Sequence, residues 1–555
     1  MWLEPFPHIR GSRLTRLVHG THFLRLGTLA SLAALLYGTV SSRLEIGWWG
    51  LVHSMSPMFL VGLTVLVVSA ILTWATPQDC SALVFGQNAL LIMALWGAPT
   101  FLRGVGWSRE QWFLGYQDYI VRNGHLNPGL LLQHNWPSQP VLMSAVQLVS
   151  GINGVGGEQA MLSLAPIATI LFWMVPVSLF FRRALSERNN LWGAGVWVFF
   201  LANRSSQEYL SAQSLAYFLW LTAVWWSLRS RPSPASSVLT YTLTSAIVTA
   251  HALTSAMSLA AKAAAGRLRT GFLPHLLVGS ILLLAWNLYW AVKFHPGAVS
   301  EFFRYAMDPE FLRLTTVARL GGPRLIYSHV DLLSRVYLAS FGALALLGAC
   351  VELLCTRSLR PFAFPLALGA LTVAVMLAIP YSGGERLTRA ALFLQLPLAF
   401  FIVRLFLRPA TKLIVVLAVI AWPFLFLVTR YGYEAYEYVR PSEGAAVEWV
   451  VGTIGQRPVE LIGDARFLLG KYNEYYRVRD FSTMLPASAR PLPPLGAVSH
   501  RVAENAIIVA NRTDRTRLDM SLGSQAALDE IYERFGSEGH TLFDDGYVKV
   551  YSQGS

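Results

Sequence analysis

The stretch PMFLVGLTVLVVSAILTWA, residues 57–75, decides the class of fold, because it contains no charged side chain. A helix needs about 20 predominantly apolar residues to cross the hydrocarbon core of a bilayer. The whole chain agrees with this stretch: of its 555 residues, 54% are hydrophobic and 14% are charged. Soluble domains carry about 25% charged residues. We therefore predict an integral membrane protein that is mainly α-helical.

Similar apolar stretches recur along the chain and predict a polytopic protein with about 13 membrane spans. The expected spans are residues 23–40, 48–75, 81–102, 160–181, 190–203, 209–228, 236–252, 253–266, 274–293, 337–355, 361–380, 390–407 and 411–429. The stretch 190–203 is short for a span, and residues 236–266 fit either a bent pair of spans or a re-entrant hairpin.

The formal net charge of +13 comes from 44 basic and 31 acidic side chains. The basic residues gather between apolar stretches, as the positive-inside rule expects of cytoplasmic loops. The number of expected spans between successive basic loops is even, which places the N-terminus in the cytoplasm. We attribute the charge to topology, expect no nucleic-acid partner, and predict the cytoplasmic membrane of a prokaryote as the location.

The expected spans divide the chain into three parts. Residues 1–80 hold two N-terminal spans, and residues 81–430 form the main transmembrane domain. In that domain, residues 103–158 and 294–336 are expected to be outer loops. After residue 430 charges become frequent and apolar runs shorten, so residues 431–555 are expected to form a small α/β domain outside the membrane.

Within this last part, short apolar runs and turn residues predict the secondary structure. VELIG (459–463) and NAIIVAN (505–511) are typical of buried strands. TLFDDGYVKVYS (541–552) predicts a hairpin with Asp545–Gly546 in a type I′ turn. Residues 441–455 and 525–536 have the pattern of helices.

The first outer loop contains SREQWFLGYQDYIVRNGHLNP, residues 108–128, a markedly polar segment for so apolar a chain. It has the pattern of an amphipathic helix, and the spacing of Glu110 and Asp118 allows both acids to share one face. Either could act as a general base that takes a proton from an acceptor hydroxyl. The alternative is an interfacial helix whose acids only face water.

Two further groups of polar residues lie at or inside the expected spans. Arg204 and Glu208 stand at the outer end of one span, Gln213 lies inside the next, and His251 lies deep in an apolar run. Polar groups at membrane depth are costly and are often functional, so these residues are candidates for a substrate pocket. A lone histidine such as His251 can alternatively serve as a hydrogen-bonding residue between helices.

The segment YSGGERLTRAALF (381–393) places Glu385, Arg386 and Arg389 at the outer end of a span. Arginines on the outer side depart from the positive-inside trend, and phosphate binding would explain them, because a guanidinium pairs with two phosphate oxygens. An ion pair with Glu385 is the alternative. Arg304, in the second outer loop, is a further candidate for phosphate binding.

Several familiar nucleotide and metal motifs are missing from the sequence. It has no P-loop, no Gly-x-Gly-x-x-Gly, no His-Glu-x-x-His and no Asp-x-Asp. No cytoplasmic domain is predicted that could bind a sugar nucleotide, so any donor is expected to come through the membrane. No cofactor is indicated, and dependence on a divalent metal is left open.

This pattern resembles the GT-C superfamily of membrane glycosyltransferases, which includes protein O-mannosyltransferases, oligosaccharyltransferases and aminoarabinose transferases. The resemblance covers roughly residues 81–555 and rests on short motifs. These are DYIVRNGHL followed by NWPSQPVLMSAVQLVSG, then SSQEYLSAQSLAYFLWL, AHALTSAM, GGERLTRAALFLQLPLAFF and the ending DDGYVKVYS.

The resemblance implies transfer of a sugar from a polyprenyl-phosphate donor to an acceptor hydroxyl on the outer face, with membrane lipid around the enzyme. The acceptor could be protein, lipid or polysaccharide. Many members carry two adjacent acids in the first outer loop, whereas Asp118 is flanked by Gln117 and Tyr119. The choice between Asp118 and Glu110 therefore stays open. Two rival functions are a non-catalytic cell-envelope scaffold and a transporter of lipid or sugar.

Overall fold

The computed structural model describes most of the helical part of the chain and the strands near its end. The residues described are 21–45, 49–103, 108–128, 132–151, 155–185, 190–203, 208–209, 211–229, 233–266, 273–291, 328–355, 362–378, 385–432, 449, 459–462, 478–480, 507–511, 540–544 and 548–552. At 108–112, 155–159, 385–388 and most strand positions, among others, only the backbone is described.

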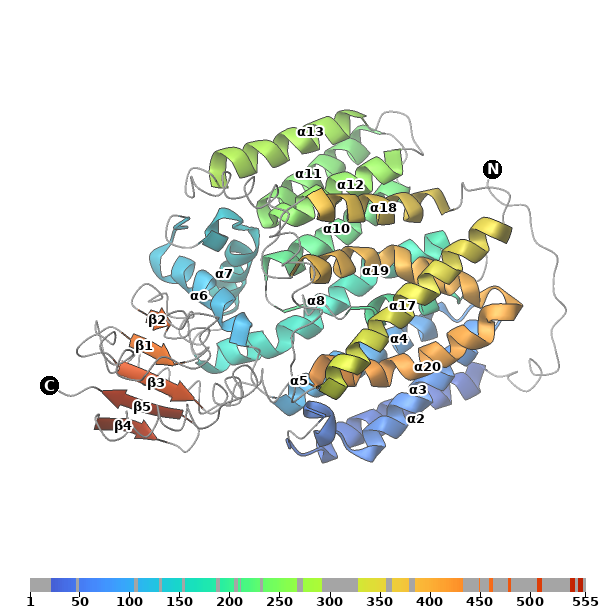
Figure 1. Cartoon of the computed structure of the whole chain (residues 1–555), viewed down its shortest axis with the longest axis horizontal. Coiled ribbons are helices and arrows are strands. Elements are labelled where there is room, and N and C mark those ends of the chain that lie inside the picture. The colour runs from blue at the N-terminus through green and yellow to red at the C-terminus, as the bar shows by residue number, and fades with distance from the viewer. Residues whose placement is uncertain are drawn as a thin grey trace.

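The first half of the chain forms a bundle of helices, with two shorter helices projecting from one end (Figure 1). Its helices are α2 (Thr21–Ser41), η1 (Leu51–Ser54), α3 (Pro57–Ala75), α4 (Ser81–Ile92), η2 (Met93–Gly97), α5 (Ala98–Arg103), α6 (Ser108–Asn123), η3 (Leu132–Asn135), α7 (Ser138–Ser150), α8 (Val155–Ala184), α9 (Trp192–Leu201) and α10 (Ala212–Arg229).

The later helices complete the same bundle. They are α11 (Pro234–Ala250), α12 (Ala252–Gly266), α13 (Leu273–Leu284), η4 (Ala285–Ala291), α17 (Ser328–Cys355), α18 (Ala363–Ala378), α19 (Glu385–Phe406) and α20 (Pro409–Tyr431). Every one of the 13 stretches expected to span the membrane contains a helix.

Among the described residues, seven helices are long and apolar enough to cross a membrane, and three shorter ones are also apolar. The chain is thus a mainly helical, polytopic membrane protein, as predicted. Several boundaries differ from expectation, two of them as follows. The second span begins as a helix only at Pro57, where Ser56 caps the end by accepting from the Phe59 N–H. Helix α17 begins at Ser328, so the last part of the expected outer loop 294–336 is helical.

The strands form one mixed sheet in the order β2-β1-β3-β5-β4. The strands are β1 (Val459–Ile462), β2 (Val478–Asp480), β3 (Ile507–Asn511), β4 (His540–Asp544) and β5 (Val548–Ser552). Strands β1 and β3 match VELIG and NAIIVAN, and antiparallel β4 and β5 match the predicted hairpin. Strand β2 was not predicted. The turn at Asp545–Gly546 and the expected helices at 441–455 and 525–536 lie outside the described residues, apart from Trp449.

Glycines allow the first two long helices to approach closely. A Cβ on Gly38 would lie 2.4 Å from the backbone nitrogen of Phe59, and one on Gly62 would lie 2.8 Å from that of Leu35. The Ser31 hydroxyl donates to the Gly62 carbonyl at 2.8 Å across this contact. Helices α2 and α3 therefore pack backbone against backbone, which a larger side chain would prevent.

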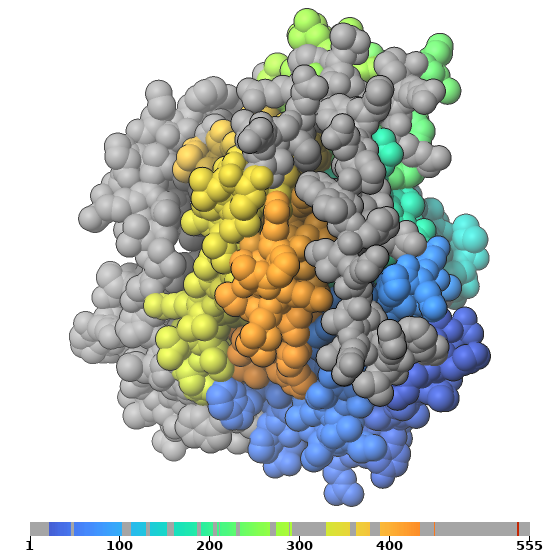
Figure 2. All heavy atoms as spheres, turned by 90° about the vertical axis from the view of Figure 1, so that its right-hand side faces the viewer, coloured from blue at the N-terminus to red at the C-terminus, as the bar shows by residue number. Residues whose placement is uncertain are grey.

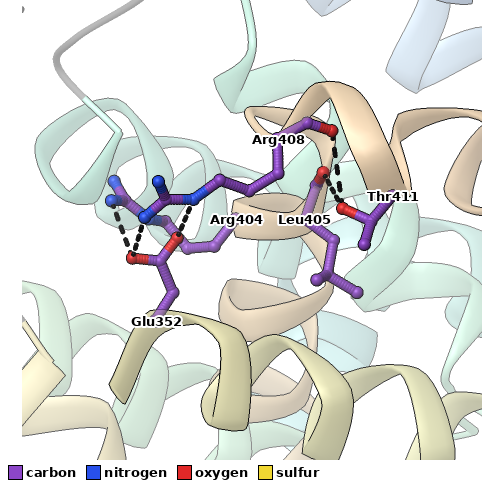
Figure 3. A network of polar contacts seen from close by, with 5 residues as sticks. All are labelled: Glu352, Arg404, Leu405, Arg408 and Thr411. Carbon is purple, nitrogen blue, oxygen red and sulfur yellow. Dashed lines mark hydrogen bonds and ion pairs between the residues drawn. The ribbon is translucent and has the colours of Figure 1, made fainter. Parts of the chain in front are cut away.

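A buried carboxylate joins three helices at the end of the bundle away from the sheet (Figure 3). Glu352, on α17, is 1% exposed and accepts from Arg404 on α19 at 3.2 Å. Arg408, which precedes α20, donates to both Glu352 oxygens at 3.3 and 3.2 Å. Figure 2 shows α17 and α20 side by side on this face. Their pairing with Glu352 ties these ends of α17, α19 and α20 together, and the loop that carries Arg408 is the one predicted to be cytoplasmic.

Candidate functional site

A buried ion pair marks the end of the bundle opposite the Glu352 cluster. Glu208 is 1% exposed, and its Oε1 accepts from the Arg430 guanidinium and, at 3.2 Å, from Trp96 Nε1. Arg430 lies in the last turn of α20, whose Tyr431 hydroxyl donates to the Leu95 carbonyl at 2.6 Å. The start of α10 therefore lies where α20 ends. Because α19 and α20 are consecutive and antiparallel, the end of α20 lies beside the start of α19, and the start of α10 therefore lies there too.

A contact between α10 and α19 brings two polar residues to one level at this end. The Tyr217 hydroxyl of α10 donates to the Leu392 carbonyl of α19 at 2.7 Å. Gln213 on α10 and Arg389 on α19 each lie about one helical turn nearer the start of their helix. Gln213 is 3% exposed, and neither polar atom of its amide has a hydrogen-bond partner among the described residues. Arg389 is 9% exposed.

His251 lies at the same end, in the single extended residue between α11 and α12. Its Nδ1 accepts from the Thr254 N–H at 3.4 Å and lies 3.1 Å from the Thr254 hydroxyl, so the side chain caps α12. This places the proton of a neutral ring on Nε2, which has no hydrogen bond among the described residues. The charge of Arg389 acts on this imidazole. Arg389 and His251 therefore bring a guanidinium and an imidazole N–H to the same end of the bundle.

Helices α6 and α7 lie beside this end of the bundle, on the same side as the sheet (Figure 1). The Gln117 amide of α6 donates to Gln147 of α7 at 2.5 Å, and the Ser144 hydroxyl donates to the Gln117 carbonyl at 3.1 Å. Asp118, on α6, pairs with Arg122 at 2.7 Å, and its side chain is 23% exposed. The predicted base is therefore partly open to solvent and already holds a cation.

Helix α7 buries polar side chains and exposes apolar ones, which is the opposite of a surface helix in a soluble domain. Gln139, Ser144 and Gln147 are buried, whereas Val141 is 44% and Val149 is 90% exposed. Such a helix suits a position in the membrane interface, with its apolar face toward lipid. At its first residue, the Ser138 hydroxyl lies 2.7 Å from the Thr249 hydroxyl of α11, two residues before His251. The helix that supports α6 is therefore attached directly at the His251 junction.

A buried histidine fixes the loop between α6 and α7. His134 is 0% exposed, its Nδ1 accepts from the Asn127 N–H at 2.9 Å, and its Nε2 donates to the Tyr116 carbonyl at 3.0 Å. Burial lowers the pKa of His134 below its ordinary value. The neutral ring with its proton on Nε2 therefore satisfies both partners. Trp286 of η4 donates to the Asn135 carbonyl at 3.0 Å and holds the loop to the bundle.

The structure brings together some of the sequence candidates and leaves others undescribed. His251 and Arg389 are neighbours, Glu208 lies at the same end of the bundle, and Asp118 lies on α6 beside it. The side chains of Glu110, Glu385 and Arg386 are not described, although their helices are, and Arg204 and Arg304 lie outside the described residues. Among the described residues, no group of three His, Cys, Asp or Glu side chains could hold a metal ion.

Sequence reasoning missed several residues of this region. Arg430 was hidden because it pairs with a residue 222 positions away. His134 follows no motif, and its role depends on backbone groups of Asn127 and Tyr116. Gln139 is 3% exposed, and neither polar atom of its amide has a partner in the described part of the chain. The signal that could have found it is a polar residue just after Trp136–Pro137, in the first turn of α7.

The fold and the site define a polytopic helical membrane protein with a group of buried polar side chains at one end of its bundle. No family model matches the chain, and no curated protein matches it. Among solved structures, it is similar to ArnT from Cupriavidus metallidurans bound to undecaprenyl phosphate, with 11% identity, 85% of this chain and 98% of that chain covered, and a TM-score of 0.44. It is also similar to the apo state of that protein, with 11% identity, 89% and 98% coverage and a TM-score of 0.43. At this identity the likeness concerns the fold alone.

Proposed function

We propose that the protein is an integral-membrane glycosyltransferase that moves a sugar from a polyprenyl-phosphate donor to an acceptor hydroxyl on the outer face of the membrane. The observation that supports this most is the position of Arg389 and His251 at the same end of the apolar helices, near enough for the charge of Arg389 to act on the imidazole. A guanidinium and an imidazole N–H can bind phosphate oxygens there, and the apolar helices can accommodate a lipid tail. Arg386 and Arg304 are proposed as further phosphate ligands, and Arg204, Glu208 and Glu385 as residues of the substrate pocket.

In the proposed reaction, Asp118 accepts the proton of the acceptor hydroxyl. The hydroxyl oxygen forms a bond to C1 of the sugar, and the bond between C1 and the phosphate oxygen breaks. The electron pair stays on the polyprenyl phosphate, and Arg389 and His251 stabilise the charge that develops there. Glu110 is the alternative base.

The test is transfer of radiolabelled sugar from polyprenyl-phosphate donors to total cell-envelope acceptors, with purified protein in liposomes. We expect Asp118→Asn to lower the rate about 10²- to 10⁴-fold, as for loss of a general base. Asp331→Asn, which removes an acid at the start of α17, should keep the rate. Full activity in Asp118→Asn would move the base to Glu110.

The same assay separates the enzyme from its rivals. No transfer from any donor by the folded wild-type protein would overturn the proposal. Retention of lipid-linked sugar without turnover would then favour a scaffold, and movement of lipid-linked sugar across the liposome membrane would favour a transporter.

A further inference from the structure

One long segment of the chain carries positive charge without any acid. Between Glu208 and Glu301 the sequence contains no Asp and no Glu, yet it includes Lys262, Lys293 and several arginines. Helices α10, α11, α12 and α13 all lie inside this segment. A cation buried among them cannot find a carboxylate on its own or the adjoining helices of the segment.

Lys262 is such a cation. It is 7% exposed, and its ammonium donates to the Thr244 hydroxyl of α11. That hydroxyl itself donates to the Thr240 carbonyl at 2.6 Å, so it offers Lys262 a neutral acceptor only. No carboxylate of the described residues forms an ion pair with this lysine. A buried ammonium with one neutral partner is costly unless an anion joins it.

A second nitrogen without a partner lies beside the ammonium. His275, on α13, has a buried Nδ1 with no hydrogen bond among the described residues, and the charge of Lys262 acts on its ring. The Tyr241 ring lies 4.8 Å from the His275 ring. A Cβ on Gly279 would lie 2.7 Å from Leu259 Cδ2 and 3.6 Å from the lysine nitrogen, so this glycine lets α13 pack closely against α12 beside the ammonium. Polar groups from α11, α12 and α13 thus converge on one point.

The position of this point along the helices suits a lipid head group. Lys262 lies four residues before the end of α12, about 6 Å along the axis, and His275 lies two residues after the start of α13. These ends belong to the side predicted to be cytoplasmic. Figure 1 shows α13 on the outside of α11 and α12, and its Ile281 is 64% exposed, as expected of a lipid-facing helix. His251 is about 16 Å away along α12, so this region is separate from the outer site.

We propose that Lys262 and His275 bind the phosphate of an anionic phospholipid of the inner leaflet, between α11, α12 and α13. The ammonium supplies the charge and the imidazole a second contact, while the acyl chains lie along the apolar face of α13. This site is independent of the proposed transfer reaction.

The test is binding of phosphatidylglycerol to the purified full-length protein in non-ionic detergent, measured by native mass spectrometry and by the shift in melting temperature. We expect Lys262→Met to weaken binding about tenfold or more, because a hydrogen bond to a charged group is lost. Lys412→Met removes an exposed lysine of the same inner side and should leave binding unchanged. Without lipid, Lys262→Met should melt no lower than the wild type, since it removes a buried charge.

A second variant and two other additives complete the design. His275→Phe keeps a ring against Tyr241 and should weaken phosphatidylglycerol binding by a smaller factor. Phosphatidylcholine should bind the wild type more weakly than phosphatidylglycerol. Equal binding of the two lipids, an unchanged affinity in both variants, or an equal melting shift with inorganic phosphate alone would each overturn the assignment to an anionic lipid.

Discussion

Loss of the Glu208 carboxylate should destabilise the protein strongly. Glu208→Gln keeps the size of the side chain and an oxygen for the Trp96 indole, but it removes the negative charge opposite Arg430. The two side chains are 1% and 6% exposed, so water cannot replace the lost partner. Removing one member of a buried ion pair typically costs about 3–5 kcal/mol. Arg430 also lies 5.5 Å from the Tyr431 ring, which favours the lower end, about 3 kcal/mol.

A double-mutant cycle measures this value. The free energy of unfolding would be determined in mixed micelles for the wild type, Glu208→Gln, Arg430→Met and the double variant. The double variant should be more stable than the sum of the single changes predicts, because no charge is then left unpaired. The role given to the ion pair would be refuted if the free energy of unfolding of Glu208→Gln lay within about 1 kcal/mol of the wild type. Strictly additive effects of the two substitutions would refute it as well.

Two further predictions concern the loop and the first helix pair. Because the pKa of His134 is lowered in the folded state, stability should be complete above the ordinary pKa of 6.5 and fall as the pH drops below it. Unfolding of the wild type beside His134→Gln from pH 7.5 to 5 checks this, and equal pH slopes would contradict it. Gly38→Ala should cost about 1–3 kcal/mol, because its methyl group meets the Phe59 backbone. Gly86→Ala, where nothing lies within 4 Å, should be neutral or stabilising, and equal melting temperatures of the two alanine variants would exclude a close α2–α3 contact.

The helices could be predicted because each is marked by an apolar stretch of neighbouring residues in the sequence. Each apolar stretch contains its own helix. The uncertain region 236–266 divides into α11 and α12, with His251 as the one residue between them. Strands β1 and β3 were found in the same way. Boundaries such as Ser328 could not be placed, because the first turns of α17 carry polar residues that also suit a loop.

The candidate site was predictable in part. Charges and histidines at the outer ends of spans pointed to His251, Arg389 and Glu208, but sequence could not show which of them meet. The partner of Glu208 lies on the last membrane helix, and no local pattern connects the two. The buried Gln213 and Gln139 depend on packing among several helices. The catalytic role of Asp118 stays a prediction.

The Glu352 cluster limits where the bundle can move. One carboxylate holds α17, α19 and α20 together at the end of the bundle away from the sheet, and separating them would leave a charge unpaired in a nearly dry environment. That end therefore acts as a fixed pivot for the three helices. Tilting about it would displace the opposite ends of α19 and α20 most, at Arg389 and Arg430. In the proposed function, a bulky lipid-linked donor would enter and leave at those ends while the helices stay together at Glu352.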